Sequence, residues 1–308
     1  MANLINALTT GVGGLETIAD ASGEIELQAD GSTIANITTS GLAVTGNLTF
    51  GGTFSASSDI TVNELTVGKG ANSIATNTAL GYQALLSNTT GGYNTAVARN
   101  SLKANTTGNQ NTAVGYNALT ANTTGNQNIA VGQNALFSNT GGSNTAVGSL
   151  SLANNTIGGN LTAIGYAALN ANTTQYWNTA IGYSAANSNT TGTVTAVGTN
   201  ALGSNTTGVA NVAVGGYTGT GATEQGALYG NTTGGRNTAV GIAALKSNTT
   251  ADNNTAVGYQ AVYANTTGAE NVGIGRAALQ NNVSGQANTA LGAYSLTLNT
   301  ANYNTAVG

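Results

Sequence analysis

Two acidic side chains are the strongest candidates for catalytic chemistry in this sequence. Asp252 and Glu270 occupy nearly the same place in consecutive copies of a repeated unit. Stacked copies would bring the two carboxylates within several ångströms of each other, a separation that glycosidases use for their acid and its partner. The alternative is that both are solvated turn residues, because neither lies among other polar chemistry. We favour that alternative, and we predict no catalytic residues and no enzyme activity.

Missing residue types remove other chemistries. The chain has no His and no Cys, which excludes a Ser-His-Asp triad, a Cys nucleophile and the usual zinc sites. A calcium-binding repeat would need regularly spaced Asp, which is absent. The Gly-rich run from Gly215 to Gly221 lacks the G-K-[ST] of a phosphate-binding loop. We therefore expect no metal and no cofactor.

A few aromatic residues are candidates for binding a partner's surface. Tyr176 and Trp177, the only Trp, fall in a predicted turn, and an insertion near 216–226 contains Tyr217 and Glu224, with Tyr229 shortly after it. Exposed aromatic rings beside Asn and Gln are typical of sugar-binding surfaces. Packing against a neighbouring turn is the alternative role, and the more common one. These five residues are the predicted surface-binding set.

An internal repeat must position these residues. From Thr76 onward the chain repeats N-T-A-V-G-Y-x-A-L-x-x-N-T-T-G-x-x, and the Gly of each A-V-G serves here as the marker. The marker recurs every 17 or 16 residues, with one step of 26, at 81, 98 (an Ala), 115, 132, 148, 165, 182, 198, 215, 241, 258, 275, 292 and 308. Asn, Thr and Gly make up 140 of 308 residues and only 16 residues are charged, unlike an ordinary globular enzyme. Such a period predicts a solenoid.

Four positions of the unit have clear preferences. The residue before the marker is aliphatic in every copy, so we predict that it forms a buried column. The residue before that is Ala in every copy but Gly273, which indicates close backbone approach across the coil or to another chain. Leu stands four after the marker in most copies, with Ala186 and Val262 as departures, and forms a predicted second core column. Asn stands seven after it in every uninterrupted copy, as a turn residue whose side chain can also stack into a ladder.

The unit is too short for a pair of helices, so we predict an all-β rod. Each coil of 16–17 residues would hold two strands of about five residues. Fourteen coils rising about 4.8 Å each would span roughly 65 Å. Period two places Thr, Val and Tyr of T-A-V-G-Y on one face and Ala and Gly on the other. Because one thin coil encloses little apolar volume, we expect three chains to bury the Ala face, at Ala96, Ala113, Ala130 and Ala146.

The N-terminal part is a different module. Residues 1–76 carry a net charge of −6, whereas residues 77–308 carry +2. We divide the chain into an attachment segment (1–40), a short β-shaft (41–76) and the repeat array (77–308) with its inserted loop. The array has no basic stripe, which disfavours nucleic acid as a partner. The first residues do not resemble a secretory signal, and no apolar run is long enough for a membrane-spanning helix.

The repeated N-T-A-V-G-Y-x-A-L-x-x-N-T-T-G resembles the repeats of tail-fibre proteins of tailed bacteriophages, and those of the head domains of trimeric autotransporter adhesins. The resemblance covers 77–308, and residues 6–15 and 41–53 are similar to the virion-proximal part of a phage fibre. It implies a trimeric β-solenoid or β-roll fibre, assembled in the host cytoplasm and located on the virion. Its N-terminus would dock to a collar, baseplate or adaptor protein, and its rod would reach a host-surface glycan or protein. The alternative is a bacterial surface adhesin or extracellular filament subunit.

The sequence stops in the middle of a repeat, at the Gly of N-T-A-V-G. Solenoids normally end in a cap that covers the last strand edge. We therefore expect the 308 residues to belong to a longer protein that continues into a receptor-binding tip, and the resemblance implies that a self-cleaving chaperone could follow it.

Overall fold

The computed structural model describes the strands between residues 16 and 44, residues 60–62, and then residues 65–216 and 225–308. The chain separates into two units, Met1–Ala56 and Ser57–Gly308. In the first unit, β1 (Glu16–Ala19), β2 (Ile25–Ala29), β3 (Ser32–Thr38) and β4 (Gly41–Val44) form an antiparallel sheet in chain order. These strands alternate apolar and polar residues, as in I-E-L-Q-A and S-T-I-A-N-I-T, a pattern that favours β structure.

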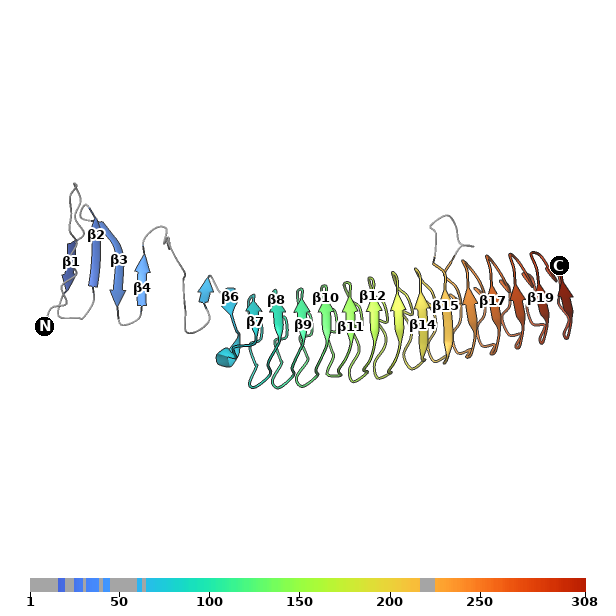
Figure 1. Ribbon diagram of the computed structural model, residues 1–308, viewed down its shortest axis with the longest axis horizontal. Coiled ribbons are helices and arrows are strands. Elements are labelled where there is room, and N and C mark those ends of the chain that lie inside the picture. The colour runs from blue at the N-terminus through green and yellow to red at the C-terminus, as the bar shows by residue number, and fades with distance from the viewer. Residues whose placement is uncertain are drawn as a thin grey trace. The chain divides into compact units, whose positions relative to one another are not determined.

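The second unit contains a single sheet of 16 strands in chain order (Figure 1). An antiparallel hairpin, β5 (Ile60–Val62) and β6 (Leu65–Gly68), precedes a 3-10 turn at Ala71–Ser73, and β6 pairs antiparallel with β7. All later pairings are parallel. The strands are β7 (Thr78–Leu80), β8 (Thr95–Val97), β9 (Thr112–Val114), β10 (Ile129–Val131), β11 (Thr145–Val147), β12 (Thr162–Ile164), β13 (Thr179–Ile181), β14 (Val194–Val197), β15 (Asn211–Val214), β16 (Thr238–Val240), β17 (Thr255–Val257), β18 (Val272–Ile274), β19 (Thr289–Leu291) and β20 (Thr305–Val307). The predicted all-β solenoid with one coil per repeat is confirmed.

Each coil has one short strand rather than the predicted two strands of about five residues. After the marker the chain turns through left-handed residues two and four positions on, such as Asn117 (φ 59°) and Leu119 (φ 51°). The Leu119 N–H still donates to the next coil, to the carbonyl of Ala135 at 3.0 Å. This side of the coil is therefore held by hydrogen bonds between coils without being a strand. Frequent Asn and Gln two positions after the marker, which tolerate this conformation, were a signal for it.

Gly is favoured at the marker for two reasons, which Gly115 illustrates; the one departure, Ala98, holds a φ of 97°. Its φ is +139°, in the region that L side chains rarely adopt. A Cβ at this position would also lie 2.6 Å from the carbonyl oxygen of Gly132, the marker of the next coil. The markers therefore let successive coils approach each other closely.

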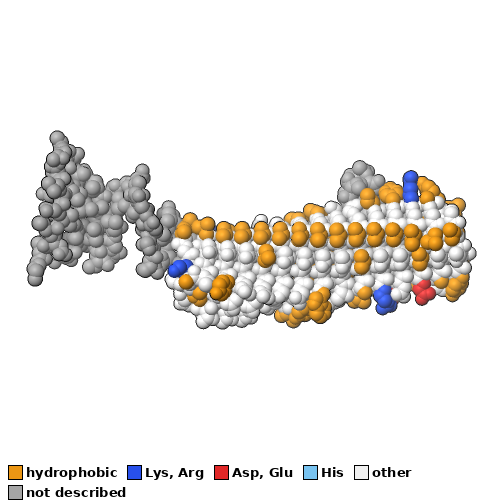
Figure 2. All heavy atoms as spheres, in the orientation of Figure 1, with side chains coloured by type: hydrophobic (Ala, Val, Ile, Leu, Met, Phe, Trp, Pro, Cys, Tyr) orange, Lys and Arg blue, Asp and Glu red, His pale blue; other side chains and the backbone are white. Residues whose placement is uncertain are grey.

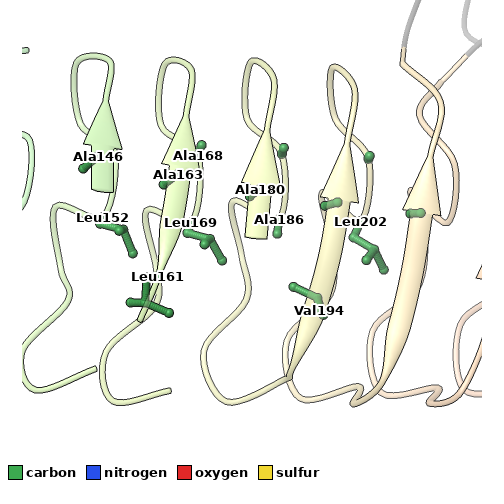
Figure 3. Close-up of a cluster of buried hydrophobic side chains, with 14 of the residues drawn as sticks. Ala146, Leu152, Leu161, Ala163, Ala168, Leu169, Ala180, Ala186, Val194 and Leu202 are labelled. Atoms are coloured by element: carbon green, nitrogen blue, oxygen red, sulfur yellow. The ribbon is translucent and has the colours of Figure 1, made fainter. Parts of the chain in front are cut away.

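The interior of the coil is formed by the Ala and Leu columns (Figure 3). Residues such as Ala163 and Leu169 have no exposed surface, so the predicted Leu core column is confirmed. The aliphatic residue before the marker was predicted to be buried, and that prediction is wrong: its side chain points out of the coil, with 36% of Val131 and 41% of Ile274 exposed. The predicted alternation along the strand is correct, but the Ala side chains face the interior and the aliphatic side chains face outward, the reverse of the prediction.

The narrow coil explains this exchange. Gly273 is the one departure from Ala in its column, and a Cβ there would lie 2.5 Å from Cγ2 of Val262. The inward strand column and the column four after the marker therefore lie very close together. The inward strand position has room for Ala but not for a side chain as large as Val. Since Ala96, Ala113, Ala130 and Ala146 are fully buried within one chain, the prediction that they line a contact between chains is also wrong.

The Asn residues seven after the marker form the predicted buried ladder. Asn105 Nδ2 donates to Asn88 Oδ1 at 2.8 Å in the preceding coil and to the carbonyl of Gly108 at 3.0 Å in its own turn. A second ladder, which the sequence analysis missed, uses the Asn that begins N-T-A-V-G. There the Asn94 N–H donates to Asn77 Oδ1 at 2.9 Å, and Asn94 Nδ2 also donates to the Gly108 carbonyl, at 2.8 Å.

Candidate functional surfaces

Asp252 acts in turn structure rather than as half of a carboxylate pair. Its Oδ1 accepts the N–H of Gly235 at 2.6 Å, and its Oδ2 pairs with Arg236 at 3.2 Å, with both side chains largely exposed. Asn109 occupies the same column as Asp252 in an earlier coil and uses the same geometry, accepting the Gly92 N–H at 2.8 Å. Glu270 meets Asp252 through the backbone, its N–H donating to the Asp252 carbonyl at 3.2 Å. The pair therefore resembles two solvated turn residues.

Metal-binding groups do not gather in the described parts of the chain. Within those residues, no three His, Cys, Asp or Glu side chains lie close enough to hold a metal ion together. The same residues contain no helix that is long and apolar enough to cross a membrane.

Tyr176 and Trp177 form an aromatic pair on the turn before β13. Their ring centroids are 5.7 Å apart and the planes are tilted by 47°. Tyr176 lies over Gly159 of the preceding coil, where a Cβ would come within 3.1 Å of its ring. Trp177 is 74% exposed, and its backbone N–H is anchored to the Gly159 carbonyl at 3.2 Å. Tyr176 thus packs on a neighbouring turn, while Trp177 presents its ring to solvent.

The structure does not bring the other predicted binding residues to this pair. Tyr229 stands between β15 and β16, in a different column, and its ring lies over Gly203, where a Cβ would be 3.2 Å from Cε2. Its carbonyl accepts the Ser204 N–H at 3.1 Å. Tyr217 and Glu224 lie outside the described residues.

The residues directly after the marker form an outward ladder, as predicted from their variation. The rings of Tyr166 and Tyr183 stack at 5.3 Å with planes 13° apart. Arg276 lies between the rings of Tyr259 and Tyr294, 6.0 and 5.4 Å from their centroids. Tyr166 and Tyr183 thus each cover one face of the other ring.

The aliphatic column before the marker is an exposed apolar feature that continues along the array, and we name it the aliphatic stripe. Figure 2 shows hydrophobic side chains in a row over the strands along the array. The strands pair in register, for example Val131 with Val147, so the side chains align from coil to coil. The stripe consists of Leu80, Val97, Val114, Val131, Val147, Ile164, Ile181, Val197, Val214, Val240, Val257, Ile274, Leu291 and Val307.

A shallow depression lies on another side of the coil. It is lined by Phe137, Leu150 and Ala153 together with the amides of Asn117, Asn134 and Asn154. It is small, and it has no charged side chain in its lining.

Comparison of the chain with models of known protein families, with curated proteins and with solved structures finds no match. Its function is therefore argued from its own residues and geometry.

Proposed function

We propose that the chain is a structural fibre protein of a tailed-phage virion, in which the repeat array is a rigid spacer between the virion and a host surface. The observation that carries this proposal is the unbroken register of the array. Parallel pairing continues from β7 to β20 across steps of 16, 17 and 26 residues, as in Ala130 with Ala146 and Ala213 with Ala239. Length changes are taken up in the turns, so the sheet continues as one stiff element.

The dimensions suit a spacer. Fourteen parallel strands at about 4.8 Å each give a rod of roughly 62 Å. Its interior is filled by Leu, Ala and hydrogen-bonded Asn side chains that have almost no exposed surface in the described coils. Each coil depends on its neighbours alone, the arrangement that lets a solenoid lengthen by adding repeats.

The ends and surface supply the proposed partners. The acidic N-terminal module would dock to a collar, baseplate or adaptor protein. The exposed Trp177, supported by Tyr176, is the best candidate in the described residues for contact with a host glycan or protein. The chain would act as a homotrimer without nucleic acid and without membrane insertion, assembled in the host cytoplasm and carried on the virion.

Immunogold labelling with antibodies raised against the array tests this proposal by negative-stain electron microscopy. Label on fibres at a virion collar or baseplate is the expected result. Label on the surface of bacterial cells, or on filaments free of virions, would contradict it and favour the adhesin or filament alternative. Substitution Trp177→Ala should reduce adsorption to host cells, with Tyr93→Ala as a control because Tyr93 is another exposed turn aromatic.

A further inference from the structure

We propose that the aliphatic stripe is covered by the same face of a second copy of this chain, lying parallel to the first. The side-by-side contact follows from the composition, area and spacing of the stripe itself. Only the parallel orientation rests on the proposed function, because copies that share an attachment end must point the same way.

The stripe position keeps the same kind of residue in every coil of the chain. Two outward positions that flank the marker behave differently. The position after it varies among Tyr, Arg, Gln, Ser, Thr, Gly, Ile and Ala, whereas the position before it is Val, Ile or Leu in all 14 coils. A solvated position has no reason to exclude polar residues fourteen times. Such uniformity at an exposed site indicates a surface that is buried in the assembled protein.

The stripe also exposes enough apolar surface area for a protein interface. About 50 Å² of apolar surface is exposed by each stripe residue, which gives on the order of 700 Å² over the array. The largest apolar patch of an ordinary monomer is roughly 300–600 Å². A stable protein interface buries about 800 Å² on each partner. The stripe and the outward residue two before it on each strand, which is Thr in most coils, therefore supply enough surface for a stable contact.

The spacing of the stripe indicates that a second copy of the chain covers it. The stripe repeats at the strand spacing of about 4.8 Å over its whole length. A globular partner would match only a few coils, whereas another copy of this array has the same spacing at every coil. The stripe and the neighbouring Thr column contain no Asp, Glu, Lys or Arg, so two such faces meet without burying an unpaired charge.

Analytical ultracentrifugation of the full chain tests the contact. We expect three times the 30.1 kDa mass of one chain, as in the proposed homotrimer. The variant Val147→Lys/Ile181→Lys places two charges on the stripe, two coils apart. It should raise the concentration at which the assembly dissociates by at least tenfold. The matched control Ile157→Lys/Val283→Lys replaces two exposed aliphatic residues on turns outside the stripe, and should leave dissociation unchanged.

Circular dichroism spectra of both variants check that they are folded. All four replaced side chains point away from the core, so the spectra should match that of the wild type. A monomeric wild type, or equal dissociation of the two variants, would overturn the proposal. A monomeric rod would also contradict the proposed homotrimer, but it would leave the spacer role of the array standing.

Cross-linking tests the orientation. The chain has no Cys, so a single Leu80→Cys substitution reports on one end of the array and Leu291→Cys on the other. Parallel copies should form disulfides between two Leu80→Cys chains. Disulfides formed only in a mixture of the two variants would show antiparallel copies, which would overturn the parallel arrangement and count against a shared attachment end.

Discussion

At the scale of single residues, side-chain volume decides what enters the coil. Val is more hydrophobic than Ala, yet Ala takes the inward position next to the stripe in every coil except one, because the opposite Leu column lies too close. The exception supports this explanation. Val262 departs from Leu and Gly273 departs from Ala, and the two face each other across the same coil, with 2.5 Å between Val262 Cγ2 and a Cβ placed on Gly273. We interpret them as a compensating pair.

This interpretation predicts coupling between the two positions. Gly273→Ala alone should destabilise the array by about 1–3 kcal/mol, because the new Cβ overpacks against Val262. The double variant Gly273→Ala/Val262→Leu recreates the pair Ala256 and Leu245 of the preceding coil, and should recover most of that loss. Urea unfolding of the wild type, both single variants and the double variant measures the coupling. Additive effects would show that the two residues do not compensate each other.

At the scale of the element, the buried Asn ladders hold one coil to the next. Asn105 uses its Nδ2 for two acceptors, Asn88 Oδ1 and the Gly108 carbonyl, and its Oδ1 accepts from Asn122 at 3.1 Å. Every polar atom of that amide is therefore paired in a site without solvent. Replacement by a group that can only accept would set oxygen against oxygen.

The variant Asn105→Asp should therefore be destabilised by several kcal/mol at pH 7. Burial among acceptors raises the pKa of the introduced carboxyl above its unfolded value of about 3.9. The folded state then favours the protonated form, so the loss is smallest below pH 4 and grows as the pH rises. Thermal unfolding at pH 3 and pH 7 checks this. Asn154→Asp, at an exposed position, is the control and should change stability little at either pH; an equal loss at both pH values for Asn105→Asp would refute the ladder's role.

Shortened turns interrupt the first ladder. After Asn139 the turn reads N-T-G, and Asn139 Nδ2 donates only to the Gly141 carbonyl, at 2.9 Å. Asn122 Oδ1 in the coil before is left buried without a donor, and Asn282 Oδ1 is unpaired beside the short turn that follows Asn299. The missing residue therefore costs a hydrogen bond.

Insertion of one Thr between Thr140 and Gly141 restores N-T-T-G and should restore the donor to Asn122. An unsatisfied buried acceptor costs about 1–3 kcal/mol, so the thermal midpoint should rise. Insertion of one Thr after Thr206, where the turn is already complete, is the control and should not raise it. A lower midpoint for the first insertion would contradict this account of the short turn.

Sequence reasoning predicted the features that depend on repetition and missed those that depend on three-dimensional size. The period, the buried Leu85 column, the Asn88 ladder and the outward Tyr116 follow from comparing copies. The outward Val114 was missed because hydrophobicity ranks Val above Ala, whereas the coil selects by volume. The second strand was wrongly predicted because the alternation continues past the marker into residues that turn left-handed. The sequence identified Trp177 as a candidate binding residue, but only the geometry of the coils shows that Tyr229 lies in a different column from it.

At the scale of the whole molecule, the array is held together almost without charge. In the coils that the structure describes, Arg236 pairs with Asp252, and this ion pair is exposed. Exposed pairs contribute about 0–1 kcal/mol. The stability of the array therefore depends on packing and on buried hydrogen bonds.

This predicts an array that is insensitive to ionic strength. The thermal midpoint of the full chain should shift by only a few degrees between 0.05 and 1 M sodium chloride, because screening weakens exposed charge pairs and little else. Arg236→Ala should lower stability by less than about 1 kcal/mol. Scanning calorimetry at several salt concentrations provides the measurement, and a steep decline with salt would reveal charge interactions that this account omits.

The stacking of coils also determines how the array bears load. When both ends are pulled, the hydrogen bonds that join the terminal coil to its neighbour carry the tension first, since each coil touches only the next. One released coil of 17 residues extends to about 55 Å, where it had occupied about 5 Å of the rod. Under tension the array would therefore lengthen in discrete steps of about 50 Å. A tether of this kind dissipates a sudden pull coil by coil and keeps its two ends connected.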